Sequence, residues 1–322
     1  MRLVFAGSPA DAVPMLEALV DAAHEIALVI TQPDRRRRRR ADPEPSPVRS
    51  AAERLGLKVV TPERSSEVVD EVAASGAVLG VVVAFGQLLP RALLDALPHG
   101  FVNVHFSLLP AWRGAAPVER AILAGDERTG VSVMEIEEGL DSGPVYAQAS
   151  TPIGDTETAG ELHARLVTMG TELLLEAVES VPTIVPEPQS GPSSYADKLT
   201  TAEFELDWSR TAEELARLVR AGNPRPGAWT TDGDTRVKVW RAEVCDADAR
   251  DADARDADAR DAEARDADDG ALAPGTLLAD GAVQTGNGKL VLAEVQPQDR
   301  RAMSASSWMA GRRSGTARLG SS

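Results

Sequence analysis

The chain has 322 residues and 43% apolar residues, which is enough for one to three globular domains with a sizeable core. Its single cysteine, Cys245, excludes an internal disulfide and fits a reducing compartment. No run of about 18 apolar residues offers a membrane span, so we expect a cytoplasmic protein. The four histidines (24, 99, 105 and 163) lack the spacing of metal ligands, and we expect no metal.

The net charge of −16 is unevenly distributed. Residues 246–269 hold eleven acidic residues and four arginines, whereas residues 207–245 and 270–322 together carry a net charge of +4. A mildly basic C-terminal part is compatible with binding phosphates, although such a charge is common in proteins that bind no nucleic acid.

The N-terminal part reads as a β-α-β unit. Residues 3–6 form a strand, a helix follows to about residue 19, and residues 25–31 form a second strand. This order predicts a parallel sheet covered by helices. A dinucleotide-binding fold begins in the same way, but it requires G-x-G-x-x-G after the first strand, and only Gly7 is present.

Six consecutive arginines occupy the loop that follows. They repel one another, so the loop of residues 32–47 reads as a solvated basic run held extended by its prolines. Beyond it we expect a helix at 46–55, a short strand at 58–60 and a helix at 63–74. The arginines are Arg35, Arg36, Arg37, Arg38, Arg39 and Arg40.

Residues 77–84 form a nearly continuous apolar run, which is typical of a strand buried on both faces. The next residues leave its carboxyl end, where ligands bind in sheets of this kind. This loop therefore either lines a pocket or is an ordinary β-to-α turn. Its residues are Phe85, Gly86, Gln87 and Leu88.

The central stretch is FVNVHFSLLPAWRGAAP, residues 101–117. It begins as a strand, so Asn103 and His105 point to the same face. An amide beside an imidazole can hold an oxygen that gains negative charge. The alternative is a buried, hydrogen-bonded pair at a strand end.

Further elements follow in order. We expect a helix at 118–124, a strand at 129–136 and a loop at 137–143 that carries Asp141. The acids Glu135, Glu137, Glu138 and Asp141 crowd together, which should raise the pKa of some of them. A strand at 145–151, a long helix at 158–179 and a Pro- and Ser-rich linker at 181–200 come next.

The C-terminal part reads as a helix at 207–222 followed by a small barrel. Its expected strands are residues 228–231, 236–244, 275–278, 281–284 and 289–295. Residues 246–269 repeat Asp-Ala-Asp-Ala-Arg with a period of five, which predicts a disordered loop; a helix is the alternative, because Ala and Arg favour it.

The central stretch, with Asp141 in MEIEEGLDSGPV, resembles the signature of the 10-formyltetrahydrofolate-dependent formyltransferases. Other matching stretches are VFAGSPADAVPMLEAL, VITQPDR, SPVRSAAERLGL and VVVAFGQLLP. The tail adds AEELARLVRAGNPRPGAW, VKVW, PGTLL and RRAMSASSWM, which are similar to the branch of the family that formylates methionyl-initiator-tRNA. The resemblance covers nearly all of the chain except residues 246–269.

The resemblance implies an α/β fold: a Rossmann-like parallel-sheet formyltransferase domain (1–188), a linker (189–206) and an OB-like, tRNA-binding β-barrel domain (207–313). It implies an enzyme that transfers the formyl group of 10-formyltetrahydrofolate to methionyl-initiator-tRNA in translation initiation. We expect a monomer without a metal. The alternatives are a folate-dependent formyltransferase that acts on a small amine, or a non-catalytic RNA-binding relative.

The resemblance also implies roles for individual residues. Asn103 and His105 would donate hydrogen bonds to the oxyanion, and Asp141 would favour a positively charged imidazole and move a proton through water. The arginine run, Arg35 to Arg40, would bind tRNA phosphates, although the family usually alternates basic residues with glycine there. Folate would contact Ser107, Leu108, Leu109, Pro110, Phe85, Gly86, Gln87 and Leu88.

Overall fold

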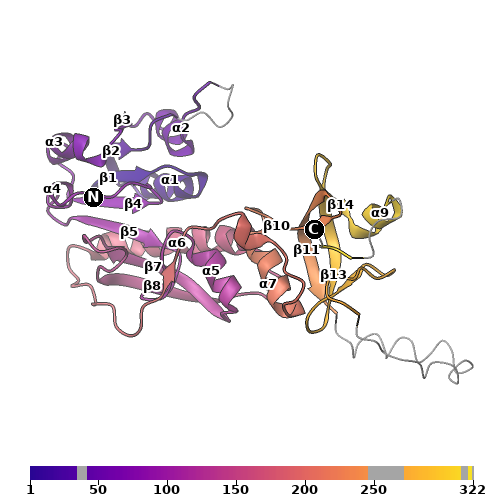
Figure 1. The fold of residues 1–322 in the computed structure, drawn as a ribbon. Helices are drawn as coiled ribbons and strands as arrows, with labels where there is room; N and C mark the ends of the chain where they lie inside the picture. Colours follow the sequence, from indigo (N-terminus) through magenta and orange to yellow (C-terminus); the bar gives the residue numbers. More distant parts are fainter. Residues whose placement is uncertain (35–41, 246–271, 313–317, 321–322) are drawn as a thin grey trace, which may run out of the picture. The chain divides into compact units, whose positions relative to one another are not determined.

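The structure is a computed structural model that describes residues 1–34, 42–245, 272–312 and 318–320 (Figure 1). The chain forms two compact units. Unit 1 comprises Met1–Ala121, Asp126–Ile153 and Glu161–Lys198, and unit 2 comprises Ile122–Gly125, Gly154–Gly160 and Leu199–Ser322.

Unit 1 is built on a seven-stranded sheet with the order β3-β2-β1-β4-β5-β7-β8. The first five strands run parallel, and β7 pairs antiparallel with both β5 and β8. This confirms the expected parallel-sheet fold and adds an antiparallel edge. The strands are β1 (Arg2–Gly7), β2 (Glu25–Ile30), β3 (Val59–Val60), β4 (Leu79–Val83), β5 (Phe101–His105), β7 (Arg128–Glu135) and β8 (Val145–Pro152).

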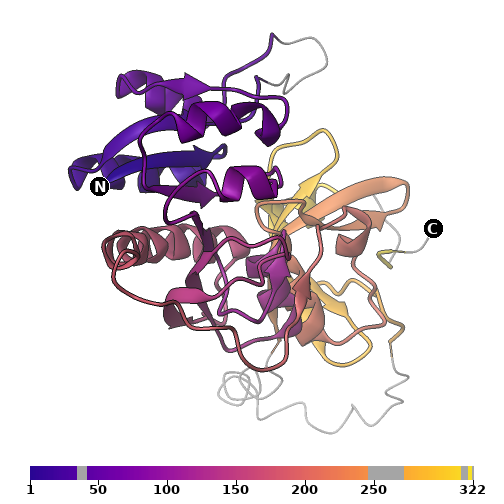
Figure 2. The same cartoon turned by 90° about the vertical axis from the view of Figure 1, so that its left-hand side faces the viewer.

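Helices connect these strands (Figure 2). Ser46 caps α2 by accepting a hydrogen bond from the Arg49 N–H at 3.0 Å, and Pro47 occupies its first turn, as the sequence predicts. The predicted helix at 63–74 is instead a 3-10 turn (Ser65–Val68) followed by α3. The helices are α1 (Val13–Asp21), α2 (Pro47–Arg54), α3 (Val69–Ala73), α4 (Arg91–Leu94), α5 (Pro117–Ala124) and α6 (Ala159–Ser180).

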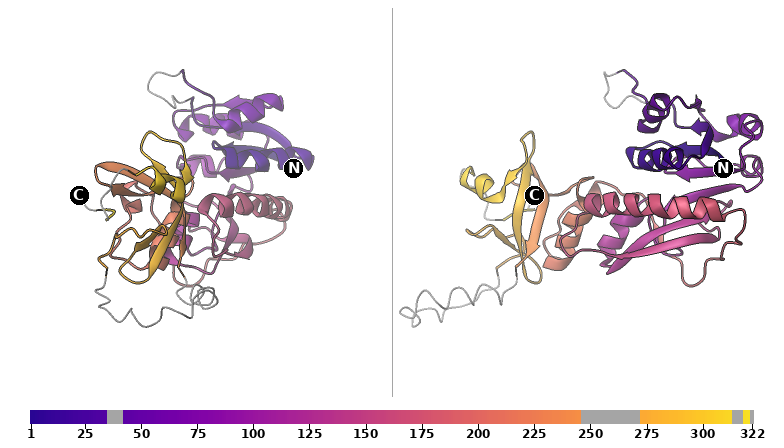
Figure 3. Two further views of the ribbon diagram at one scale, coloured as in Figure 1. Left: turned by 90° about the vertical axis from the view of Figure 1, so that its right-hand side faces the viewer. Right: turned by 180° about the vertical axis from the view of Figure 1, so that it is seen from behind.

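Alternate residues of a strand point to opposite sides, and the central strands β4 and β5 are buried on both faces. On one side, Val4, Ile30 and Phe101 pack with side chains of α3 and α4 in one apolar cluster. On the other side, Gly170 of α6, the long helix of Figure 3, lies close to Met15 of α1 and Val104 of β5. Within β5, Asn103 and His105 therefore share the side of Phe101.

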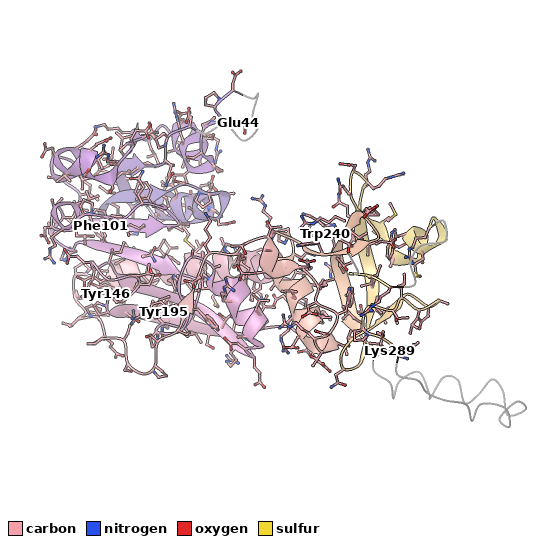
Figure 4. The ribbon with its side chains drawn as sticks, viewed as in Figure 1. Glu44, Phe101, Tyr146, Tyr195, Trp240 and Lys289 are labelled. Atoms are coloured by element: carbon pink, nitrogen blue, oxygen red, sulfur yellow. The ribbon has the colours of Figure 1, made fainter. Side chains whose placement is uncertain are left out.

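A segment read from the sequence as part of a linker is hydrogen-bonded within unit 1. We call residues 187–196 the strap. Its Glu187 pairs with Val145 through two backbone hydrogen bonds of 2.8 and 2.9 Å. At its other end, β9 (Tyr195–Ala196) pairs with β6 (Arg113–Gly114); Tyr195 is labelled in Figure 4. The strap thus joins the loop after β5 to the start of β8.

Unit 2 contains α7 (Ala212–Gly222) and a sheet of order β10-β11-β13-β12, with β14 paired to β13 (Figure 3). The helix begins at Ala212 rather than at 207. Asp207 accepts a hydrogen bond from the Ser209 N–H at 3.0 Å, and Thr211 forms a capping box with Glu214, so the first residues make a turn.

The remaining strands pair antiparallel, and the expected short strands are present with one correction. The predicted strand at 275–278 is not a strand, because Thr276 and Leu277 make isolated bridges. The predicted loop at 246–269 lies outside the described residues. The elements of this sheet and its last helix are β10 (Ala228–Asp232), β11 (Thr235–Val244), β12 (Ala282–Gln284), β13 (Lys289–Pro297), β14 (Met303–Ser304) and α9 (Ala305–Ala310).

Candidate active site

Asn103 and His105 stand at the carboxyl end of β5, a central strand of unit 1. The strand pairs with β4 through Asn103 and with β7 through both residues, so its backbone is fixed on two sides. The imidazole is buried, with 7% of the side chain exposed. The Asn103 side chain is half-buried and, within the described part of the chain, makes no hydrogen bond. Its amide is therefore available to a ligand.

The two ring nitrogens of His105 have different surroundings. Nε2 lies 2.8 Å from the backbone oxygen of Trp112. A carbonyl oxygen only accepts, so Nε2 carries a hydrogen and donates it. Nδ1 lies 3.7 Å from Oδ2 of Asp141. The nitrogen that can take up or release a proton is therefore the one that faces the carboxylate.

Asp141 is held in place by a backbone amide. Its Oδ2 accepts a hydrogen bond from the Gly114 N–H at 2.8 Å, and only 16% of its side chain is exposed. Gly114 has φ +123°, and a Cβ there would lie 2.7 Å from the oxygen of Ala196, so glycine is required. Asp141 itself has φ +46°, a left-handed conformation that Asp tolerates better than most residues.

The other acids of this region fit the expected crowding. Burial, and secondly the charge of Glu137, raises the pKa of Glu135. Glu137 and Glu138 are more exposed than Glu135. Asp141 differs from these three acids by its contact with a buried imidazole.

The predicted folate-binding turn, residues 107–110, is held by hydrogen bonds to side chains of β7 and β8. Ser132 of β7 donates a hydrogen bond to the Ser107 oxygen at 2.6 Å and accepts one from the Leu109 N–H at 3.1 Å. Gln148 of β8 donates to the Leu109 oxygen at 2.8 Å. Leu108 packs on Gly130, and Pro110 is half-buried. Three of the turn's backbone groups are thus occupied, which makes it rigid.

The other predicted folate loop offers one free apolar side chain. Phe85 is buried and its oxygen accepts a hydrogen bond from Gln32 Nε2 at 2.9 Å. Gln87 donates to the Pro62 oxygen at 3.2 Å, and Gly86 adopts φ +77°. Leu88, in contrast, is 86% exposed.

The remaining expectations concern the arginine run, a metal ion and a membrane span. The arginine run, Arg35 to Arg40, lies outside the described residues. Within residues 1–34, 42–245, 272–312 and 318–320, no group of three His, Cys, Asp or Glu side chains is placed to hold a metal ion. Over the same residues, no helix combines the length and apolar character that crossing a bilayer requires.

Sequence reasoning did not identify several residues that complete the site. Gln189 and Ser194 of the strap hydrogen-bond to Arg113 and to the Trp112 N–H, respectively. Both lie in a stretch whose prolines and serines suggest a linker. Ser132 and Gln148 lie in strands, where the alternation of apolar and polar residues indicates which side chains face inward but not which of them hydrogen-bond to a distant turn.

Comparison with known proteins identifies the class. The sequence pattern of the family described as formyl transferase matches residues 1–178, and that of its C-terminal domain matches residues 198–313. The chain belongs to the formyl transferase family.

The relatives define the branch more closely. The methionyl-tRNA formyltransferase of Ruegeria pomeroyi is 42% identical over 97% of this chain and 97% of its own length. That of Roseobacter denitrificans is 48% identical over 76% of this chain and 82% of its own length. The chain is thus similar to enzymes that bear this name.

Solved structures agree in fold. HypX from Aquifex aeolicus, in complex with tetrahydrofolic acid, superimposes with a TM-score of 0.63 at 17% identity, over 97% of this chain and 47% of that one. An N-formyltransferase from Helicobacter canadensis gives 0.60 at 20% identity, over 76% of this chain and 87% of that one. At this identity the likeness concerns the fold alone.

We predict that Ser132→Ala destabilises unit 1 by about 1–3 kcal/mol, because it leaves buried groups of the 107–110 turn without partners. The free energy of unfolding from urea titration, followed by fluorescence, measures this. Ser66→Ala, at an exposed serine, is the control. An equal effect of both substitutions would show that the Ser132 hydrogen bonds do not anchor the turn.

Proposed function

We propose that this chain transfers the formyl group of 10-formyltetrahydrofolate to the α-amino group of methionyl-initiator-tRNA, in translation initiation in the cytoplasm. The observation that carries this proposal is the contact of 3.7 Å between His105 Nδ1 and Asp141, beside the available amide of Asn103. Membership of the formyl transferase family and the names of its relatives support it.

The first step is attack of the methionyl amine on the formyl carbon. The nitrogen lone pair forms the new N–C bond, and the electrons of the C=O double bond move to the oxygen. Asn103 donates its amide hydrogen to that oxyanion, and His105, protonated at Nδ1, is the second donor. Asp141 stabilises the positive charge that the imidazole then carries.

The second step is collapse of the tetrahedral intermediate. The C=O bond re-forms, the bond between the formyl carbon and N10 breaks, and N10 keeps the electron pair. The attacking nitrogen loses a proton and N10 gains one, so the exchange is balanced. His105 Nδ1 and Asp141 form the proton path, directly or through one water. The products are formylmethionyl-tRNA and tetrahydrofolate.

We assign folate binding to the two loops described above. Leu88 of the 85–88 loop is 86% exposed, and Leu140 of the loop that carries Asp141 is 57% exposed; both offer apolar surface that a bound aromatic ring system would cover. The rigid turn Ser107, Leu108, Leu109 and Pro110 follows β5, close in sequence to Asn103 and His105. Phe85, Gly86 and Gln87 precede Leu88, and hydrogen bonds of Phe85 with Gln32 and of Gln87 with Pro62 fix this loop.

A cationic and aromatic face of unit 2 supports a tRNA partner. The guanidinium of Arg236 lies 3.8 Å from the ring centre of Trp229, and the Lys238 ammonium lies 5.0 Å from that of Trp240, labelled in Figure 4. These four side chains share one face of β10 and β11, because the opposite positions are buried in the core.

Exposed arginines continue this face. Gln298 donates its N–H to the Arg236 oxygen at 2.8 Å, which places the β13–β14 turn beside the start of β11. Arg300 and Arg301 of that turn are exposed. We assign them to tRNA phosphates, as sequence-independent contacts. We also assign Arg35 to Arg40 to phosphates, on the family resemblance.

We predict that His105→Ala lowers kcat for formyl transfer by about 100- to 1000-fold, the usual effect of losing an oxyanion donor. Asp141→Asn, which removes the negative charge beside the imidazole, also lowers kcat. A formylation assay with charged initiator tRNA measures both, and circular dichroism checks folding. His99→Ala and Asp70→Asn, outside the site, are matched controls. Near-normal kcat in both site variants would eliminate the proposed roles.

We predict that Arg300→Ala combined with Arg301→Ala raises KM for tRNA about tenfold and leaves kcat at saturation unchanged. The dependence of log KM on log salt should become shallower by about 1 to 2, because two phosphate contacts are lost.

Lys289→Ala is the control for this pair. Lys289, labelled in Figure 4, is an exposed cation at the other end of β13. The strand has nine residues and spans about 30 Å. The same KM change in the control and in the arginine variant would argue for diffuse attraction rather than for this face.

A further inference from the structure

The strap (residues 187–196) crosses the candidate site, and one of its side chains has an unusually complete set of hydrogen bonds. Gln189 Oε1 accepts from Arg113 Nε at 3.1 Å and from Arg113 Nη2 at 2.6 Å. Gln189 Nε2 donates to the Asp141 oxygen at 2.9 Å and to the Gly143 oxygen at 2.8 Å. The amide therefore contacts both segments that form the site.

The chemistry of these partners fixes the orientation of the amide. A guanidinium only donates, and the two backbone oxygens only accept. Turning the amide by 180° would place its NH₂ group against Arg113 and its oxygen against the two carbonyl oxygens. Glutamine is therefore the side chain of this size that satisfies all four contacts, because glutamate lacks the donor.

These contacts close a ring around Asp141. The carboxylate of Asp141 is held by the Gly114 N–H at 2.8 Å. Gly114 follows Arg113, whose side chain is held by Gln189. Gln189 in turn holds the backbone oxygen of Asp141. Asp141 is thus fixed at its side chain and at its main chain by groups that are linked to each other.

We propose that Gln189 is a positioning residue for the formyl transfer, which holds Asp141 at its contact with His105 Nδ1. This inference rests on the proposed function. Asp141 has φ +46°, a conformation that a non-glycine residue keeps only where its surroundings impose it. Gln189 supplies this constraint to residues 141 and 143. Gln189 acts through Asp141 and takes no part in bond making.

The test is Gln189→Glu. The new carboxylate still pairs with Arg113, but it loses both donated hydrogen bonds and turns an oxygen toward the Asp141 and Gly143 oxygens. A small displacement of a catalytic group lowers rates strongly, so we expect kcat to fall about 10- to 100-fold. KM for folate and for tRNA should change less than about threefold, since both binding surfaces are intact. Gln284→Glu is the matched control, because Gln284 Nε2 also donates to two backbone oxygens, those of Thr285 and Gly288, and lies outside both proposed binding surfaces.

A double-mutant cycle separates positioning from a general structural role. If Gln189 acts through Asp141, Gln189→Glu combined with Asp141→Asn has the same kcat as Asp141→Asn alone. Independent, multiplying effects would overturn the inference. A kcat for Gln189→Glu within twofold of that of the original protein would also overturn it. A loss of activity fully explained by a smaller folded fraction in circular dichroism would do the same.

A readout without substrates keeps this inference distinct from the proposed function. The imidazole ¹⁵N chemical shifts of His105, measured by NMR, report its contact with Asp141. In Gln189→Glu they should move toward those of Asp141→Asn, while those of His99 stay constant. If the original protein failed to formylate tRNA, the proposed function would fall, yet the shifts would still decide whether Gln189 positions Asp141. Unchanged His105 shifts would contradict it.

Discussion

The site depends on one hydrogen bond, from the Gly114 N–H to the Asp141 carboxylate, 2.8 Å long. This bond brings a carboxylate from the loop after β7 to the imidazole at the end of β5. It requires a close approach of the backbone at Gly114, where a Cβ would meet Ala196. Without it, the carboxylate would be one more exposed acid in an acidic loop.

The sheet explains why this bond forms where it does. Because β7 runs antiparallel to β5, Ser132 lies opposite His105 in the register. Ser132 and Gln148 then anchor the 107–110 turn from strands that are themselves hydrogen-bonded to each other. Beyond that turn, the chain passes through Trp112, which binds the His105 ring, and Gly114, which binds Asp141. The turn therefore sets both contacts of the imidazole.

The features that sequence analysis predicted have local causes. The apolar run at 77–84 became a buried strand, and alternation placed Asn103 and His105 on one face, because both follow from the period of a strand. Ser46 and Pro47 marked a helix start through capping chemistry that involves only neighbouring residues. The fold class was predicted correctly for the same reason and from the family resemblance.

What the sequence did not predict depends on contacts between distant residues. Prolines and serines suggested a linker from residue 181 onward, yet the strap pairs with Val145 and β6, which no local pattern encodes. Gln189 carries no signal in isolation, since its role arises only when Arg113 and Asp141 meet it. Likewise, the carbonyl of Trp112 determines which nitrogen of His105 is free.

The central claim is that Asn103 and the His105–Asp141 pair surround an oxygen that becomes negatively charged. A crystal structure with a stable folate analogue that carries its formyl group on N10 tests it most directly. The account predicts the formyl oxygen at about 2.7–3.1 Å from the Asn103 side-chain nitrogen, with His105 and Asp141 still in contact. A formyl group bound away from the end of β5, or an Asp141 carboxylate turned away from His105 in that complex, would contradict it.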